Sequence, residues 1–320
     1  MTLTQIAYNI FIGDKPSKEN LNTLKKQCIK LLVNLFPDRK SELNNSNTDG
    51  ESIEKHVFTI EDYDMNILKI EVPEKVLDTY CGNGTLLVDI VKIIYIESLK
   101  VPIYIYSTDN SLDVLISALI YAFINNTNIN ETMLEVKKLK LIEKTYAYET
   151  DETKIDVNEI MEGVKLIIGN HLEPFDFYRA PHPFSNFSKH KVFSSKFQKE
   201  FPYSEAAFMA YKSPENPEYI EGLSLAKSPG VAKSMGRKVN LRKDWEQVKY
   251  DCMVETLRDK VKSNPPIKAV IEETGIKPIY EHTKNDKIWG DNLDRTGRNL
   301  LGKAWNQIRL EYTAGLILVS

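Results

Sequence analysis

Two patterns of hydrophobic and polar positions divide the chain. Up to about residue 145, short apolar runs alternate with segments of helical periodicity. Short apolar runs bounded by turns predict buried strands, and apolar residues with a period of about 3.6 predict amphipathic helices. Strands alternating with helices predict an α/β layered fold with some parallel strands. We expect strands at Ile6–Ile12, Ile29–Leu35 and Val101–Tyr106, and helices at Ser17–Gln27, Leu86–Leu99, Leu112–Ile124 and Asn130–Glu143.

The second part of the chain is mostly helical in pattern. Residues 146–159 are polar and acidic without a clear period, so we place the domain boundary near them. Beyond them helical periodicity dominates, most plainly at Trp245–Lys262, and the loops are rich in Pro, Gly and Asn. We therefore expect an α/β domain at residues 1–150, a linker at 151–168, and a mostly helical α+β domain at 169–320.

Composition and charge exclude several classes of protein. The net charge is −3, so there is no overall positive field, and any nucleic acid must bind to a local basic patch. The three cysteines lie far apart, which argues against a disulfide framework and a cysteine-based zinc site. No secretory signal is visible, and the longest apolar stretch, Leu86–Ile96, contains charged residues. We expect a cytoplasmic protein with no membrane contact, metal or cofactor.

The first domain contains a strand, a loop and a helix start in the order used by phosphate-binding folds. These lie at Val101–Asp113. Together with Asn9–Ser17 and Lys30–Leu35, they resemble the dual-specificity phosphatase fold over residues 6–144. The resemblance implies that this domain has a phosphorylated or nucleotide ligand, if it has a ligand at all.

The catalytic residues of that family are not matched. The family uses a His-Cys-x5-Arg loop, in which the thiolate attacks phosphate and the arginine holds it through two hydrogen bonds. Here Tyr106, Ser107 and Asp113 take the positions of His, Cys and Arg. A hydroxyl without an activating base is a far weaker nucleophile than a thiolate, and Asp113 would repel phosphate. We therefore predict a phosphatase-like domain without phosphatase activity.

A second family has a similar glycine-rich segment. Val76–Leu86 looks like the loop with which methyltransferases bind S-adenosylmethionine, and Asp109 could bind a ribose. However, Pro73 and Glu74 make a poor buried strand before this loop. No methyltransferase catalytic motif follows at a suitable distance, so we favour the phosphatase-like interpretation.

The stretch Phe184–Lys212 contains the best candidate for a reactive carboxylate. Pro202 and Ser204 suit the start of a helix, which places Glu205 in its first turn. A first-turn glutamate is also a common solvated residue, because the helix dipole favours it there. Spacings of three, four and seven positions bring four side chains near one helix face, namely Glu205, Phe208, Met209 and Lys212.

Later blocks of the chain add groups of complementary chemistry. They contain a second carboxylate, Asp286, and two tryptophans, Trp245 and Trp289. An indole face suits a flat base, although most tryptophans are largely buried. Arg237 follows a glycine and suits a phosphate, and Lys233 is a second candidate for this role, although Lys233 and Arg242 could simply be solvated. The combination is more specific than any single block.

The order and spacing of these blocks resemble the NADAR superfamily (NAD- and ADP-ribose-associated, YbiA-like) over about Phe184–Arg309. Members of that family cleave N-glycosidic bonds. Some act on phosphoribosylamino intermediates of riboflavin synthesis, and others remove ADP-ribose from guanine in nucleic acid. The resemblance implies that Glu205, Trp245, Asp286 and Trp289 are active-site positions.

With this resemblance the full set of candidates can be named. The candidate catalytic residues are Glu205, Asp286 and Lys212, and the candidate binding residues are Phe184, Ser185, Asn186, Phe187, Lys233, Gly236, Arg237, Trp245, Trp289 and Gly290. The chain departs from the family in four places. Ala206 and Met209 replace a usual His and Gln, and Asn292 and Arg295 stand where glycines are common. We expect these changes to narrow or recharge the pocket and to alter the substrate rather than the reaction.

The resemblance and the residues together predict an N-glycoside hydrolase that removes ADP-ribose from guanine in nucleic acid. Glu205 would activate water near the sugar C1, and Asp286 would contact ribose hydroxyls or the leaving base. Trp245 and Trp289 would sandwich an aromatic ring. Lys212 is a rival catalytic group, because an amine could trap an opened ribose as a Schiff base. A non-catalytic NAD or ADP-ribose-binding module and a hydrolase of riboflavin-pathway intermediates are the alternatives.

We expect the full chain to show no turnover of phosphotyrosine or small phosphate esters, because a hydroxyl and a carboxylate replace the family's thiolate and guanidinium. Phosphate release from these substrates checks this directly. Robust turnover would refute the interpretation of the first domain.

Overall fold

The computed structural model describes most of the chain and divides it into two units. The described residues are 3–7, 9–13, 15–38, 55–73, 84–107, 110–138, 172–284 and 286–317. Residue contacts separate Met1–Glu173 from Pro174–Ser320, and each unit is treated by itself. The predicted boundary at 146–159, the linker at 151–168, Asp109, and Glu74–Asn83 of the methyltransferase-like stretch lie outside the described residues.

The N-terminal unit is built on a mixed six-stranded sheet in the order β1-β2-β6-β3-β5-β4. The four central strands β2, β6, β3 and β5 run parallel to one another, and the edge strands β1 and β4 pair antiparallel with β2 and β5. The predicted α/β class with parallel strands is therefore confirmed. The strands span Leu3–Ala7 (β1), Ile10–Gly13 (β2), Leu31–Asp38 (β3), Lys55–Ile60 (β4), Met65–Pro73 (β5) and Ile103–Ser107 (β6).

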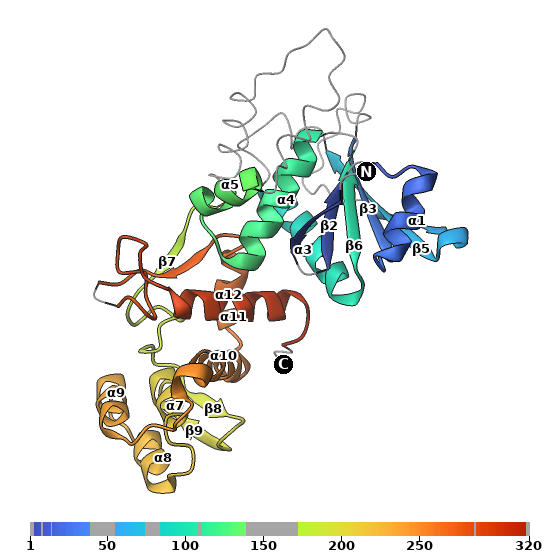
Figure 1. Ribbon diagram of the computed structural model, residues 1–320. Helices are drawn as coiled ribbons and strands as arrows, with labels where there is room; N and C mark the ends of the chain where they lie inside the picture. The colour runs from blue at the N-terminus through green and yellow to red at the C-terminus, as the bar shows by residue number, and fades with distance from the viewer. Residues whose placement is uncertain are drawn as a thin grey trace. The chain divides into compact units, whose positions relative to one another are not determined.

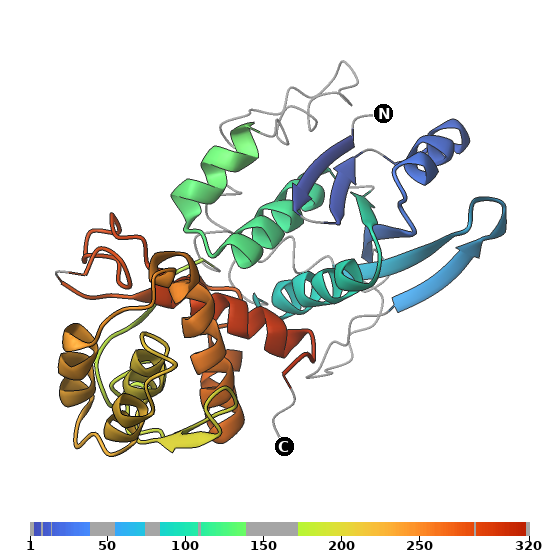
Figure 2. The same ribbon diagram turned by 60° about the horizontal axis from the view of Figure 1, so that its bottom comes forward.

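Helices lie on both sides of this sheet. In both views α1 is on one side, and α3 and α4 are on the other (Figures 1 and 2). Ser17 caps α1 by accepting a hydrogen bond from the Asn20 N–H, as its position in the sequence predicts. Tyr106 and Ser107 end β6, and Asp113 lies early in α4, while the phosphatase resemblance itself stays a prediction. The helices span Lys18–Lys26 (α1), Gly84–Lys100 (α3), Asn110–Asn125 (α4) and Ile129–Lys138 (α5).

Sequence patterns missed part of the sheet. The single strand expected at Ile6–Ile12 is a hairpin of β1 and β2, and Asn9 between them has a φ of 60°, in the left-handed region. Asn tolerates this region better than most residues, so it suits the turn. β4 and β5 were not predicted. They form an antiparallel pair, joined through the short 3-10 helix Glu61–Tyr63.

The C-terminal unit is mostly helical, as predicted, with two small sheets. β7 (Phe175–Phe177) pairs in parallel with β10 (Ile279–Glu281), and β8 (Val192–Ser194) pairs antiparallel with β9 (Lys199–Phe201). The long helix α10 packs against both α12 and α7. The helices span Ser204–Ala210 (α7), Pro217–Ser224 (α8), Pro229–Lys238 (α9), Trp245–Ser263 (α10), Ile267–Glu273 (α11) and Leu300–Thr313 (α12).

Local sequence signals explain where two of these helices begin. Asn216 caps α8 and Ser228 caps α9, each through a side-chain oxygen that accepts a backbone N–H. Each cap is followed by proline, Pro217 and Pro229, whose missing N–H costs nothing in the first turn. The start of α9 sets the position of two candidate binding residues, Lys233 and Arg237, which this helix carries.

The core of the C-terminal unit contains Trp305, which is fully buried. Its ring stacks on Phe184 with a centroid distance of 4.0 Å and an interplanar angle of 13°. The indole N–H donates a hydrogen bond of 2.9 Å to the Phe184 carbonyl. Phe184 is itself 0% exposed, so the prediction that it binds substrate is wrong. It is a core residue.

A buried lysine fixes the turn that follows Phe184. The Lys260 ammonium donates hydrogen bonds of 2.9 Å to the Ser185 carbonyl and to the Ser188 hydroxyl. The whole side chain is 0% exposed, and burial lowers the pKa of Lys260 to about 7. Together with Trp305, Lys260 therefore holds the backbone before Asn186 and the Ser188 side chain after it.

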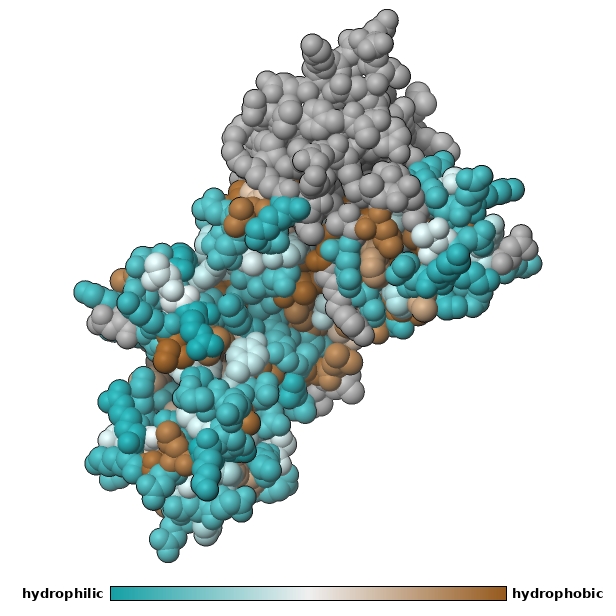
Figure 3. All heavy atoms as spheres, in the orientation of Figure 1, coloured by the Kyte–Doolittle hydropathy of each residue, from teal (hydrophilic) through white to brown (hydrophobic). Residues whose placement is uncertain are grey.

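The surface of the C-terminal unit is mostly hydrophilic, in contrast to its apolar core. On the face shown in Figure 3, hydrophilic residues cover most of the C-terminal unit, at the lower left, and hydrophobic residues form only small groups. In the part of the chain that the structure describes, no helix combines the length and apolar character needed to span a bilayer.

We expect Gly302→Ala to destabilise the C-terminal unit by about 1–3 kcal/mol. A Cβ at this position in α12 would lie 2.1 Å from the Ile279 carbonyl oxygen and 2.4 Å from the Asn299 side chain. Gly230→Ala is the matched control, because its Cβ would find no atom closer than 3.8 Å. Thermal or denaturant unfolding measures both variants, and equal stabilities would contradict the close approach of α12 to β10.

Candidate functional site

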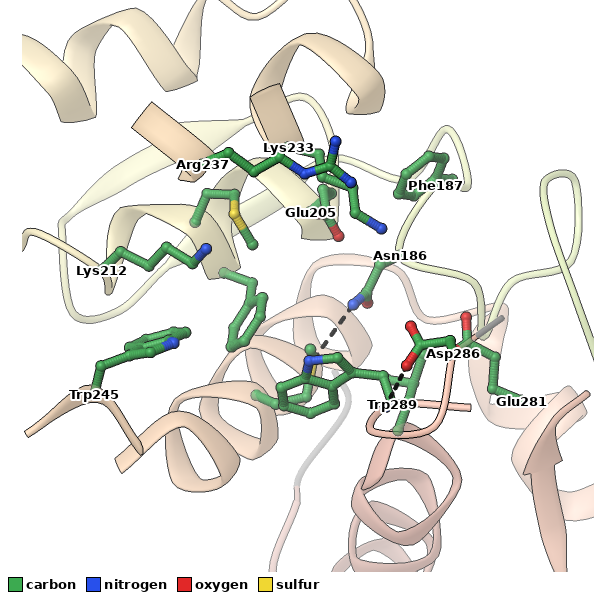
Figure 4. Close-up of a pocket in the computed structure, with 14 residues that line it drawn as sticks. Asn186, Phe187, Glu205, Lys212, Lys233, Arg237, Trp245, Glu281, Asp286 and Trp289 are labelled. Atoms are coloured by element: carbon green, nitrogen blue, oxygen red, sulfur yellow. Dashed lines mark hydrogen bonds between the residues drawn. The ribbon is translucent and has the colours of Figure 1, made fainter. Parts of the chain in front are cut away.

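One cavity in the C-terminal unit gathers most of the side chains that the sequence singled out. Its volume is about 190 Å³. Figure 4 shows Lys212 and Trp245 toward one end, Asp286 and Glu281 toward the other, and Glu205 and Lys233 between them. The predicted residues that line the cavity are Asn186, Phe187, Glu205, Lys212, Lys233, Arg237, Trp245, Asp286 and Trp289.

The helix α7 presents Glu205 to this cavity. It begins at Ser204, with Tyr203 at the N-cap, so Pro202 precedes the helix and Ser204 is not the cap that the sequence predicted. The Glu205 N–H donates a hydrogen bond of 3.1 Å to the Asn186 carbonyl. The Glu205 side chain is mostly buried, at 6% exposed. Because of this bond, the position of the carboxylate depends on the turn that Lys260 and Trp305 hold.

Two cations reach the cavity from α9. Lys233 and Arg237 are four positions apart and therefore lie on one helix face. The face of α9 that is turned toward α7 is closely packed at Gly236. A Cβ added at Gly236 would lie 2.1 Å from the Met209 sulfur. The Gly236 carbonyl accepts a hydrogen bond of 2.9 Å from the Lys212 ammonium. Gly236 thus permits the approach of the two helices and does not line the cavity, in contrast to its predicted binding role.

The two indoles do not form the open sandwich that we expected. The ring of Phe208 packs against both, with centroid distances of 5.4 Å to Trp245 and 5.1 Å to Trp289. The Lys212 ammonium lies 5.6 Å from the centre of the Trp245 ring. Each indole is therefore part of an aromatic wall and can contact a ligand separately.

Backbone hydrogen bonds orient Asp286. Its Oδ1 accepts bonds from the N–H groups of Ile288 at 3.0 Å and Trp289 at 2.8 Å. This turn places the carboxylate and the indole on the same cavity wall. Gly290 follows, is buried, and does not line the cavity as predicted. Asn285, which precedes this turn, lies outside the described residues.

The loop after this turn contains the two residues that replace glycines. Asn292 and Arg295 have φ values of 64° and 63°, so both adopt the left-handed backbone that glycine favours. The Arg295 guanidinium binds Asp176 at 2.7 and 2.9 Å and Asp291 at 2.8 Å. Neither replacement lines a cavity described here, so the expectation that they narrow or recharge the pocket is wrong. Arg295 instead stabilises the loop.

Sequence analysis missed a third carboxylate, Glu281. It ends the three-residue strand β10, and its N–H donates a hydrogen bond of 3.0 Å to the Asn299 side chain. Its side chain lines the cavity beside Asp286. The only local signal is a carboxylate at the end of the short apolar run Ile279–Tyr280. This signal is too weak to identify a site residue.

Burial and repulsion between carboxylates raise the pKa values of two acidic side chains in the cavity. Burial raises the pKa of Glu205 to about 7, and the charge of Asp286 adds to the rise, while Lys233, Lys212 and Arg237 oppose it. Burial, Asp286 and Glu205 raise the pKa of Glu281 to about 7 as well. Burial lowers the pKa of Lys212. Two carboxyl groups can thus exchange protons near neutral pH within one cavity.

An adjoining cavity of about 560 Å³ opens beside the first. The two share Phe187, Lys233, Glu281 and Asp286. Ser185 lines this second cavity and not the first. Within the described ranges, no group of three or more His, Cys, Asp or Glu side chains is placed to hold a metal ion.

The site defines a class of protein: a domain with a cavity lined by carboxylates, cations and aromatic rings. Residues 176–312 match the family model for the NADAR domain. The chain belongs to the NADAR family through this C-terminal part. The resemblance stated from the sequence is therefore confirmed for the second domain, while the first domain is unassigned.

Several relatives support this membership. The N-glycosidase YbiA of Escherichia coli (strain K12) is 34% identical over 137 residues, which cover 42% of this chain and 85% of that protein. An N-glycosidase of Nostoc punctiforme is 30% identical and is covered to 90% of its length, with 42% of this chain matched. The riboflavin biosynthesis protein PYRR of Arabidopsis thaliana is 30% identical over 111 residues, which cover 33% of this chain and 18% of that protein.

A solved structure is also similar to this chain. The NMR structure of the Escherichia coli protein YbiA has 32% sequence identity and a TM-score of 0.41. The match covers 45% of this chain and 86% of that one.

We expect Glu205→Gln to stabilise the protein at pH 8 by about 1–3 kcal/mol and to leave stability almost unchanged at pH 4.5. The folded protein keeps a proton on Glu205 up to about pH 7, whereas an ordinary glutamate loses it near 4.5. Stability is therefore lost as pH rises through this window, and glutamine removes that loss. Denaturant unfolding at both pH values measures the difference.

Glu218→Gln is the matched control, because Glu218 is exposed on α8. It should show no such pH-dependent gain. A Glu205→Gln variant that is no more stable than the wild type at pH 8 would contradict the desolvation of Glu205.

Proposed function

We propose that residues 176–312 hydrolyse an N-glycosidic bond between a nitrogen base and an ADP-ribosyl or phosphoribosyl group. ADP-ribose on guanine in nucleic acid is the proposed substrate. The observation that carries the proposal is one cavity that brings Glu205, Glu281 and Asp286 together with Lys212, Lys233 and Arg237. Relatives of this chain named N-glycosidases support it.

The reaction needs a carboxylate near the sugar C1. As the C1–N bond breaks, the base keeps the electron pair and positive charge develops on C1 and the ring oxygen. Glu205 stabilises this charge and accepts a proton from the water whose oxygen bonds to C1. A pKa of about 7 leaves Glu205 partly ionised at neutral pH, so it can act as this base.

The leaving base needs a proton. Glu281 lies beside Asp286, and burial raises its pKa to about 7, so it is partly protonated at neutral pH and its protonated form can give a proton to the base nitrogen. Asp286 is held by two backbone N–H groups and is suited to contact ribose hydroxyls. The two carboxyl groups thus divide proton transfer and sugar orientation between them.

The cations and aromatic rings suit the rest of the glycosyl group. Lys233 and Arg237 are exposed on one face of α9 and would bind phosphate oxygens. No ion pair within 4.0 Å engages either of them among the described side chains. Trp245 and Trp289 would contact aromatic or sugar rings separately, because Phe208 packs against both.

Lys212 is the rival catalytic group. Its lowered pKa increases the neutral fraction of the amine, which is the form that attacks a carbonyl carbon. A Schiff base between Lys212 and an opened ribose would be trapped by borohydride as a stable adduct. No adduct forms if Glu205 and water carry the reaction.

Two other functions use the same cavity. A relative named for riboflavin biosynthesis favours the same hydrolysis on a smaller phosphoribosylamino substrate. A binding module that holds NAD or ADP-ribose without cleavage would need the cations and rings, but it would have no use for two carboxyl groups with raised pKa values.

The test is release of ADP-ribose from ADP-ribosylated guanosine or DNA by the full chain. Glu205→Gln should lower kcat by about 10²–10⁴-fold and leave ligand binding largely intact, because only the reaction needs the charged group. Glu218→Gln should keep the wild-type rate. Wild-type rates for Glu205→Gln would reject its role, and binding without any product would favour the module.

A further inference from the structure

The adjoining cavity has a chemistry of its own. Besides the residues shared with the first cavity, it is lined by Tyr178, Arg179 and Lys284, and by the buried Thr283. Tyr178 is 46% exposed, so the cavity has an accessible aromatic residue. The Arg179 guanidinium lies 4.8 Å from the centre of that ring. An aromatic surface beside a guanidinium suits a base that carries a phosphate.

The charges along the two cavities follow an order. Lys212 and Arg237 line only the first cavity, and Arg179 and Lys284 line only the second. Glu281, Asp286 and Lys233 line both, so two carboxylates and one ammonium group mark the region where the cavities meet. An elongated ligand that fills both would therefore have its anionic groups at the two ends and its electron-poor sugar carbon near the middle.

The cations of the second cavity have no acidic partner among the described residues, although Arg179 also hydrogen-bonds to the Tyr178 side chain. Within the described part of the chain, neither Arg179 nor Lys284 forms an ion pair within 4.0 Å. Both side chains are exposed. By contrast, Arg295 binds both Asp176 and Asp291. A structural arginine in this region thus has acidic partners, and Arg179 and Lys284 have none.

We infer that the second cavity binds the leaving group of the reaction, and that this leaving group is a nucleotide with its own phosphate. This inference rests on the proposed N-glycosidase function. Tyr178 would stack on the departing base, and Arg179 and Lys284 would bind its phosphate. The glycosyl group would occupy the first cavity, so that the bond to be broken lies between Glu205 and Glu281.

The inference separates two kinds of substrate. A phosphoribosylamino compound has a phosphate only on the sugar side and leaves the cations of the second cavity unused. A glycosylated nucleotide has phosphates on both sides of the bond and uses both sets. The free nucleotide and a nucleic acid strand share this chemistry, and the experiment distinguishes them.

The experiment compares three substrates that have the same glycosyl group. In these substrates the glycosyl group is attached to guanosine, to guanosine 5′-monophosphate, or to one guanine of a short DNA strand. For the wild-type full chain, we expect kcat/KM to be about 10–100-fold higher for the two substrates whose leaving group has a phosphate than for the guanosine substrate. This factor corresponds to the free energy of hydrogen bonds to a charged group. This ratio should fall close to one in Arg179→Gln/Lys284→Gln. The control is Lys238→Gln/Lys287→Gln, which removes two positive charges outside both cavities. This control variant should show the same ratio as the wild type.

A wild-type ratio near one, or a full ratio in the double variant, would overturn the inference. Lys284→Gln alone repeats the test if the change at Arg179, whose φ is 59°, disturbs its loop. An advantage for the monophosphate supports a free nucleotide, and an advantage confined to the DNA supports a strand. If no substrate releases its base, the proposed function itself fails, which is a different result from equal rates on all three.

Discussion

The site depends on how the turn after Phe184 is held. Stacking on Trp305 and the two hydrogen bonds from the Lys260 ammonium fix this turn from the core side. From the cavity side, the carbonyl of Asn186 accepts the Glu205 N–H at the start of α7. A buried ammonium with neutral partners is costly, since desolvation lowers the pKa of Lys260 to about 7. The domain tolerates this cost in order to hold the backbone of its central carboxylate.

A second constraint is the closeness of α7 and α9. Gly236 lets the Met209 side chain cross the helix interface, and its carbonyl binds the Lys212 ammonium. The same contact sets the direction in which Lys233 and Arg237 point, because all three residues belong to one short helix. Cations and the Glu205 carboxylate are therefore brought together by packing, and their charges then adjust one another's protonation.

The sequence predicted the parts of the site that follow from local periodicity. Glu205 and Lys212 reach the same cavity because their spacing puts them near one helix face. Phe184 was misassigned because sequence does not show which aromatic residue of a turn packs inward. Glu281 could not be found, because its position comes from the pairing of β10 with β7, about 100 residues earlier in the chain. Arg295 resembled a pocket charge, but its partner Asp176 is distant in sequence and lies outside both cavities.

The cavity that Glu205 and Glu281 both line also explains how proton transfer is coupled to bond cleavage in the proposed reaction. Burial keeps Glu205 and Glu281 largely protonated below about pH 7, because their charged forms lack solvent. Positive charge on the sugar would lower the pKa of both groups, since an opposite charge nearby favours ionisation. Glu281 would then become a stronger acid as the leaving nitrogen becomes a stronger base. The desolvation that destabilises the resting carboxyl groups thus allows them to respond to the charge that the reaction creates.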